Sequence, residues 1–225
     1  MHLLSVNIGL PRHSEHTEAA VTGIDKRPVD GPVAVTAPGP QGIGGSALAG
    51  DTIGNLRHHG GNDQAVYAFA REDLDRWQDE LGRSLPNGVF GENLTTAGVD
   101  VSGALIGERW RVGPDLLLEV TSGRIPCRTF AGRLGEHAWI KRFTAAAAPG
   151  AYLRVLEPGE IRAGDPVVIA HRPAHGVTVS LAFRAVTLEP ELLPRLLAAG
   201  DALHPEARRR ALKRSGGRTA QPRGV

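Results

Sequence analysis

The spacing of apolar residues along the chain favours many short strands. Apolar runs that alternate with polar residues, or that are fully apolar over four to eight positions, are typical of β-strands when turn residues bound them. Gly113-Pro114-Asp115 is one such turn, and Ala163-Gly164-Asp165-Pro166 is another. Many short strands at close spacing predict a mainly β fold built on a closed or half-closed β-barrel, with some α-helix. We expect strands at residues 3–8, 33–36, 65–69, 104–112, 116–122, 151–157 and 166–170.

Two helices are expected within this strand-rich part of the chain. In residues 71–81, Leu74, Trp77 and Leu81 recur at intervals of three and four, and acidic residues occupy the opposite face. Gly82 follows as a suitable helix stop. A second helical segment is expected between residues 135 and 148, where it ends before a proline.

The pattern changes after His171, where three helical segments follow one another. We expect helices at 177–186, with Thr178 as N-cap, at 190–199 and at 205–214, the last two opened by proline. The sequence therefore predicts a β domain over residues 1–170 and a three-helix element over 177–214. Residues 215–225 contain too few apolar side chains to form a core, and we expect them to be disordered.

Composition agrees with this architecture and limits where the protein works. The chain has 225 residues, with 29 glycines, 16 prolines and 4% aromatic residues, which is typical of a fold rich in turns. A single cysteine excludes an intrachain disulfide and favours a reducing compartment. We expect no signal peptide and no membrane span, and hence a cytoplasmic protein.

Positive charge is concentrated in the C-terminal part of the chain. Residues 171–225 hold ten Lys/Arg and four Asp/Glu, whereas residues 1–170 hold sixteen and twenty. The basic run Arg208-Arg209-Arg210 has no interleaved aromatic residues, so we expect no nucleic-acid partner. We interpret the run as a solvated helix end, with guidance of an acidic redox partner as the alternative.

The single cysteine, Cys127, is the strongest candidate for chemistry. It follows the strand predicted at 116–122, and Arg124 and Arg128 flank it. Nearby cations favour the thiolate, which attacks electrophiles and binds soft metals. A lone cysteine can also be a small buried apolar side chain, and the flanking arginines leave the two interpretations open.

Six motifs occur in the order seen in MOSC-domain proteins, and the chain resembles this family. Residues 1–170 carry most of the resemblance, which extends to the C-terminal domain of molybdenum cofactor sulfurase. The likeness is greatest to the stand-alone bacterial branch that confers resistance to 6-hydroxylaminopurine, in which three helices follow the barrel. The motifs are Lys26-Arg27-Pro28-Val29, Gly50-Asp51, His59-Gly60-Gly61, Ala65-Val66-Tyr67, Phe90-Gly91-Glu92-Asn93-Leu94 and Arg124-Ile125-Pro126-Cys127.

The resemblance implies a β-barrel that binds the molybdenum cofactor (molybdopterin), with Cys127 as the metal ligand. A soft thiolate suits molybdenum, and Arg124 is the implied anion contact. The remaining motif residues suggest further roles. Lys26 and Arg27 would hold the pterin phosphate, His59 would donate a hydrogen bond or a proton, and Glu92 and Asn93 would bond the edges of the pterin ring.

The reaction implied by the resemblance is the reduction of N-hydroxylated compounds such as hydroxylaminopurines, hydroxylamines and amidoximes. Two electrons would cleave the N–O bond and release water, and the cofactor would carry the chemistry. One cysteine cannot hold an iron–sulfur cluster, so an external flavin or iron–sulfur reductase would supply the electrons. The three-helix element could be its docking surface or a cap on the barrel. The sequence does not decide between a monomer and a homodimer.

Two other functions remain open. The thiol could carry sulfur as a persulfide, or hold the cofactor for delivery, without turnover. Cys127 could instead be a nucleophile with His59 as its base, as in Cys/His hydrolases, if the two side chains meet in space.

Overall fold

An eight-stranded mixed sheet forms the body of the molecule in the computed structural model, which describes residues 1–216. Neighbouring strands pair antiparallel except β4 and β5, which are parallel. A separate two-stranded sheet pairs β3 (Val33–Val35) with β9 (Gly159–Ile161). The order in the large sheet is β10 (Val167–His171), β6 (Arg109–Val112), β7 (Leu116–Ser122), β8 (Ala151–Glu157), β4 (Val66–Ala70), β5 (Leu94–Ala97), β1 (His2–Gly9) and β2 (Lys26–Pro28).

The sheet curls until β1 meets the start of β10. The backbone N–H of Leu3 donates to the carbonyl of Asp165 at 2.9 Å, and that of Val167 donates to the carbonyl of Met1 at 3.0 Å. His2 and Pro166 form an isolated bridge between them. Within residues 1–216 this seam is too short to form a strand ladder, so the sheet is half-closed rather than a full barrel. The mainly β fold with added helices is confirmed.

Most predicted strands are confirmed, with one correction. The strand expected over 104–112 is wrong in its first half, because β6 begins only at Arg109. Gly107 lies in the left-handed region with φ 85°, and its N–H donates to the carbonyl of Val120. The preceding residue, Ile106, donates instead to Val177. The N–H of Glu108 donates to the carbonyl of Leu105 at 2.8 Å, so the chain turns at 105–108 and β6 starts only after this turn. Three strands were not predicted: β2 and β9, of three residues each, and β5, of four residues.

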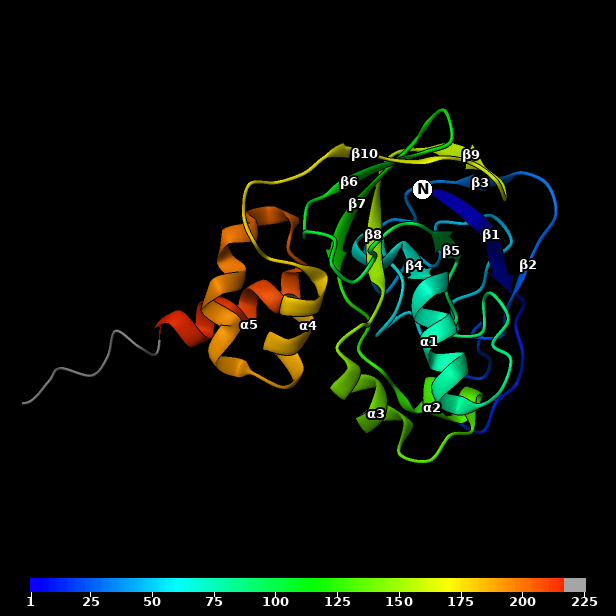
Figure 1. Ribbon diagram of the computed structural model, residues 1–225, viewed down its shortest axis with the longest axis horizontal. Coiled ribbons are helices and arrows are strands. Elements are labelled where there is room, and N and C mark those ends of the chain that lie inside the picture. Colours follow the sequence, from blue (N-terminus) through cyan, green and yellow to red (C-terminus); the bar gives the residue numbers. More distant parts are fainter. Residues whose placement is uncertain (217–225) are drawn as a thin grey trace, which may run out of the picture.

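Helix α1 (Arg71–Leu81) has the bounds that the sequence predicted. It buries Leu74 and Trp77 and ends at Gly82, which adopts a left-handed conformation with φ 64° and donates its N–H to the carbonyl of Gln78. Figure 1 shows α1 lying against the strands of the sheet, near β4 and β5.

The helical segment expected between residues 135 and 148 is confirmed, and a further short helix precedes it. Helix α2 (Arg128–Leu134) was not predicted and ends at Gly135, whose φ of 69° reverses the chain. Helix α3 (Trp139–Ala146) then starts after Ala138, which also has a positive φ. Cys127 is the N-cap residue of α2, so the cysteine is at the junction between a strand end and a helix start.

Three further helical segments form a separate group beside the sheet, as expected (Figure 1). They are α4 (Val179–Thr187), η2 (Pro190–Ala202) and α5 (Pro205–Gly216). The predicted cap is confirmed, because the Thr178 hydroxyl accepts from the N–H of Leu181 at 3.0 Å. The division into domains 1–170 and 177–214 stays a prediction. Residues 215 and 216 continue α5, and residues 217–225 of the predicted disordered tail lie outside the described part of the chain.

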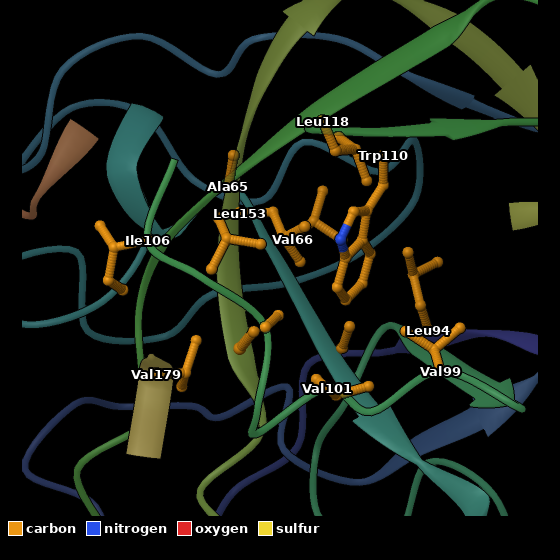
Figure 2. Packing of buried hydrophobic residues seen from close by; sticks show 14 of the residues in the cluster. Ala65, Val66, Leu94, Val99, Val101, Ile106, Trp110, Leu118, Leu153 and Val179 are labelled. Atoms are coloured by element: carbon orange, nitrogen blue, oxygen red, sulfur yellow. The ribbon is translucent and has the colours of Figure 1, made fainter. Parts of the chain in front are cut away.

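The core has two parts of different character. The larger part is mostly aliphatic and surrounds Trp110, whose indole N–H donates to the buried carboxylate of Glu108 at 2.9 Å. Figure 2 shows Trp110 among Leu94, Val99 and Leu118. The second part is aromatic and takes in eight of the ten aromatic residues of the chain. Its members are Tyr67, Phe69, Trp77, Phe90, Phe130, Trp139, Phe143 and the partly buried Tyr152.

Across residues 1–216, no helix has the length and apolarity that crossing a membrane requires.

Candidate functional site

The single cysteine lies in the wall of a cavity of about 570 Å³. Small-molecule and cofactor sites are commonly clefts of about 300–1,000 Å³. The cavity is lined by distant parts of the chain: the loop that contains His59, strand β2, the segment from Gly123 to Thr129, and the ends of α4 and α5. The fold thus brings together five of the seven residues predicted for the site: Lys26, His59, Asn93, Arg124 and Cys127.

Cys127 is held as a thiolate in this cavity. Burial alone would raise the pKa of its thiol, but a hydrogen bond with His59, the charge of Arg124 and the backbone N–H of Phe130 together lower the pKa from 9.0 to about 6. At pH 7 the thiolate is therefore the main form. Sequence reasoning paired Cys127 with His59 only as a hypothesis, and the structure places both side chains on one cavity, near enough for His59 to lower the thiol pKa.

Arg124 is a buried cation directly beside the thiolate. Its guanidinium lies 4.4 Å from the centre of the Phe130 ring and 5.0 Å from that of Tyr67, both within cation–π range. It donates from Nη1 to the carbonyl of Phe90. Burial opposes its charge, but the neighbouring Tyr152, Tyr67 and Cys127 raise the pKa of Arg124. The aromatic part of the core thus contacts and stabilises the Arg124 guanidinium.

Lys26 supplies a second buried cation, paired with Asp51. Their side chains are 5% and 0% exposed, and the ammonium group donates to Oδ1 of the carboxylate. The same carboxylate accepts from the N–H of Gly9 at 2.8 Å and from the amide of Asn93 at 2.9 Å. Burial lowers the pKa of Lys26, and the Asp51 carboxylate opposes that shift. Asp51 therefore positions the lysine, and it belongs to the Gly50-Asp51 motif, which by itself indicates no role.

Arg27 does not share the cavity with Lys26. Its side chain is 69% exposed and pairs with Asp25 at 3.2 Å. Successive residues of a strand point to opposite faces, and both residues belong to β2. The geometry thus does not support a shared phosphate site.

Glu92 lies behind the cavity wall. Its carboxylate is fully buried and accepts from the N–H groups of Gly88 and Phe90 and from the hydroxyl of Thr95, at 2.5, 3.0 and 2.9 Å. Burial raises the pKa of Glu92, and these bonds oppose the shift. Because the carboxylate is bonded within the protein, Glu92 stabilises the conformation of the 88–92 loop.

Asn93 lines the cavity, but its amide is used by the protein itself. Oδ1 accepts from the N–H of Tyr67 at 3.1 Å, and Nδ2 donates to Asp51 and, at 3.4 Å, to the carbonyl of Asn7. These bonds join β4, the loop at Asp51 and β1 around the lysine.

The outer wall of the cavity comes from the helical element, which sequence reasoning treated only as a cap or docking surface. Val186 and Thr187 at the end of α4, and Glu206 and Arg210 on α5, line the same cavity as Cys127. Arg210 donates to the carbonyl of Val186 at 3.0 Å. Glu206 and Arg210 are four residues apart, which places both on one face of the helix. This spacing is the feature of the sequence that indicates a polar helix face toward the cavity.

A half-closed sheet, with a cysteine in the segment after a strand and facing a cavity with buried cations, is what the sequence motifs led us to expect of a MOSC domain. The family model for the MOSC domain matches residues 55–168, and the chain belongs to this family. MOSC domains are associated with binding of the molybdenum cofactor.

The chain is similar to several proteins over most of its length. It is 32% identical to the uncharacterized protein YflK of Bacillus subtilis over 183 residues, which are 81% of this chain and 79% of that protein. The crystal structure of YiiM from Geobacillus stearothermophilus matches with a TM-score of 0.75 and 26% identity, covering 95% of this chain and 98% of that one. A protein of Gibberella moniliformis named as a reductase is 30% identical over 175 residues, which are 76% of this chain but 29% of that protein.

Proposed function

We propose that this protein binds the molybdenum cofactor and reduces N-hydroxylated compounds, with Cys127 as the protein ligand of the metal. The observation that carries the proposal is the thiolate: Cys127, with a pKa of about 6, shares one cavity with the two buried cations Lys26 and Arg124. A soft ligand beside cations suits a soft metal carried on an anionic group.

The residues present fit such a group. The Nε of Arg124 is buried and has no hydrogen-bond partner among residues 1–216. Gly91 lines the cavity with φ 76°, and a Cβ there would lie 3.2 Å from Nη1 of Arg124 and 3.0 Å from Ile24. The absence of a Cβ at Gly91 therefore lets the Arg124 guanidinium keep its position beside the cavity. Residues 1–216 contain no group of three or more His, Cys, Asp or Glu side chains suited to a metal, so a metal at Cys127 would take its other ligands from a prosthetic group.

In the proposed reaction the chain's own residues bind, orient and move protons. When bound, the cofactor supplies the two electrons that cleave the N–O bond. Two protons are also consumed as R–NHOH becomes R–NH₂ and water. His59 lines the cavity and hydrogen-bonds the thiol, so it is placed to hold and pass a proton. Burial raises the pKa of Tyr152, so its hydroxyl stays protonated and can donate a hydrogen bond.

Electrons come from a separate partner in this proposal, a flavin or iron–sulfur reductase, because one cysteine cannot hold a cluster. The relative named as a reductase carries most of its length outside the matched part. Such additional chain could deliver electrons within one polypeptide, a role that we assign here to a partner.

The test begins with metal content. Protein expressed in a host that makes the cofactor should contain stoichiometric molybdenum and pterin, and Cys127→Ala should lose the metal. His137→Ala replaces an exposed histidine outside the cavity and should keep the metal. The loaded protein, supplied with a chemical reductant, should reduce benzamidoxime. Metal bound without turnover would instead indicate a cofactor or sulfur carrier. No metal in the wild type, under conditions that load other molybdoenzymes, would refute the proposal.

A further inference from the structure

A second cavity, of about 100 Å³, adjoins the Cys127 cavity where the sheet meets the helical element. The two cavities share a wall, because the same six residues line both. They are Gln64, Gly123, Ile125, Val186, Glu206 and Arg210. A molecule bound at Cys127 can therefore extend past this wall into what we call the side cavity.

Beyond the shared wall, which carries the charged residues Glu206 and Arg210, four of the six residues that line the side cavity are apolar. Ala182, Phe183 and Leu203 line it and are 5%, 1% and 2% exposed. Ile125 also lines it and is 48% exposed, which is a large apolar surface next to a polar site. Apolar walls with a few placed polar groups are typical of ligand sites.

His204 supplies an uncharged polar group to this cavity. Burial lowers the pKa of its imidazole, so the ring is neutral at pH 7. Its Nδ1 accepts from the backbone N–H of Glu206 at 3.3 Å, so the ring proton is on Nε2. Beyond the charged shared wall, a neutral N–H donor beside Ala182, Phe183 and Leu203 suits an uncharged aromatic group better than an ion.

Size and position point to one aromatic ring. A dry cavity of about 150 Å³ in another protein binds benzene, so about 100 Å³ with an open side suits a single six-membered ring. Ile125 is two residues before Cys127, which places their Cα atoms at most about 7 Å apart. A ring against Ile125 would thus leave its substituent within reach of the thiolate.

We propose that the side cavity holds the aromatic ring of an N-hydroxylated substrate, so that the helical element selects ring-bearing substrates. This inference rests on the proposed function for the identity of the reacting group, but the binding of a ring is tested separately. The probe is benzamide, which has the ring but no N–O bond, and its binding to the full chain is followed by ligand-observed NMR.

Ala207→Leu is the principal variant, because Ala207 lines the side cavity and three added carbon atoms would fill much of it. Arg209→Leu is the matched control, since it adds the same side chain to the same helix at an exposed position outside both cavities. Ala207→Leu should weaken benzamide binding about ten-fold or more, and Arg209→Leu should leave it unchanged. Ile125→Ala, at a half-exposed position that should not disturb folding, should weaken binding several-fold.

The two proposals fail in different ways. Equal benzamide affinity in the wild type, Ala207→Leu and Ile125→Ala would overturn the side-cavity inference, whatever the activity. In loaded protein, Ala207→Leu should lower kcat/KM for benzamidoxime about ten-fold and leave that for acetamidoxime, which has no ring, unchanged. An equal loss for both substrates would also overturn it. If the wild type reduces neither substrate, the proposed function fails, while benzamide binding still decides the side cavity.

Discussion

Replacement of His59 should raise the pKa of the only thiol in the chain. Burial of Cys127 favours the neutral thiol, and the hydrogen bond with His59 is the largest of the effects that outweigh it. A hydrogen bond to an ionised group contributes about 1.5–3 kcal/mol, which corresponds to about one to two pKa units. His59→Ala should therefore shift the titration of Cys127 upward from about 6 by about that much.

The assay is the pH dependence of alkylation by iodoacetamide, which reports a single site because the sequence has one cysteine. The midpoint of the rate profile gives the thiol pKa without depending on the intrinsic nucleophilicity of the thiolate. At pH 7 a thiol with a pKa of about 6 is about nine-tenths ionised, whereas one with a pKa of 9.0 is about one-hundredth ionised. His137→Ala, at an exposed position outside the cavity, is the matched control and should leave the midpoint unchanged.

Two results would refute the reasoning. A wild-type midpoint near 9 would mean that burial, and not the surrounding donors, decides the state of the thiol. An unchanged midpoint in His59→Ala would mean that Arg124 and the Phe130 N–H suffice without the imidazole.

The same shift makes stability depend on pH. The folded-state pKa of Cys127 is depressed, so the thiolate stabilises the fold fully above pH 9 and this contribution is lost as the pH falls through about 6. The difference in unfolding free energy between the wild type and Cys127→Ala should accordingly shrink from pH 9 to pH 6. A constant difference in urea denaturation across that range would contradict the assigned pKa.

Three further substitutions test the structure around the site. Glu92→Gln places an amide where a buried carboxylate accepts hydrogen bonds from two N–H groups and a hydroxyl. It should lower the unfolding free energy by about 1–3 kcal/mol in urea denaturation. An unchanged value would mean that these bonds are dispensable and that Glu92 is free to bond the pterin ring. Thr178→Ala removes the hydroxyl that caps α4 at Leu181 and should cost about 1 kcal/mol by the same measurement; no loss would show that the cap is dispensable. Gly132→Ala puts a Cβ 2.1 Å from the ring of His16, so it should displace the segment before residue 20. Limited proteolysis should then cleave this segment faster. An unchanged cleavage rate would mean that the segment is not held by this contact.

Local patterns in the sequence were sufficient for much of the fold but not for its closest turns. The helix over 71–81 was predictable because its apolar spacing, first-turn acids and terminal glycine agree. Helix α2 was missed because Gly132 and the proline before Cys127 both argue against a helix. The structure explains that glycine by the ring of His16, which fills the place of a Cβ.

The site could be located from its motifs, but the roles within it depended on contacts between distant residues. Lys26 and Arg27 are adjacent in one motif, yet a strand of three residues sends them to opposite faces. No local pattern shows that Asp51 forms an ion pair with Lys26, or that the Glu92 carboxylate accepts its hydrogen bonds from its own loop. The meeting of His59 with Cys127 is likewise a product of topology.

The seam between the first strand and the residues before β10 has a consequence for how the chain reaches its native state. β1 pairs with β5 over residues 2–6 and with β2 over residues 7–9, and it meets Asp165, Pro166 and Val167 at its start. Contacts between residues so far apart in sequence are slow to form, because closing the long loop costs entropy before the contacts contribute any stabilisation. During synthesis the start of β1 must therefore wait, with its outer edge unpaired, until most of the chain has left the ribosome. We expect this seam to form late in refolding, and its exposure to set how prone the nascent chain is to aggregation.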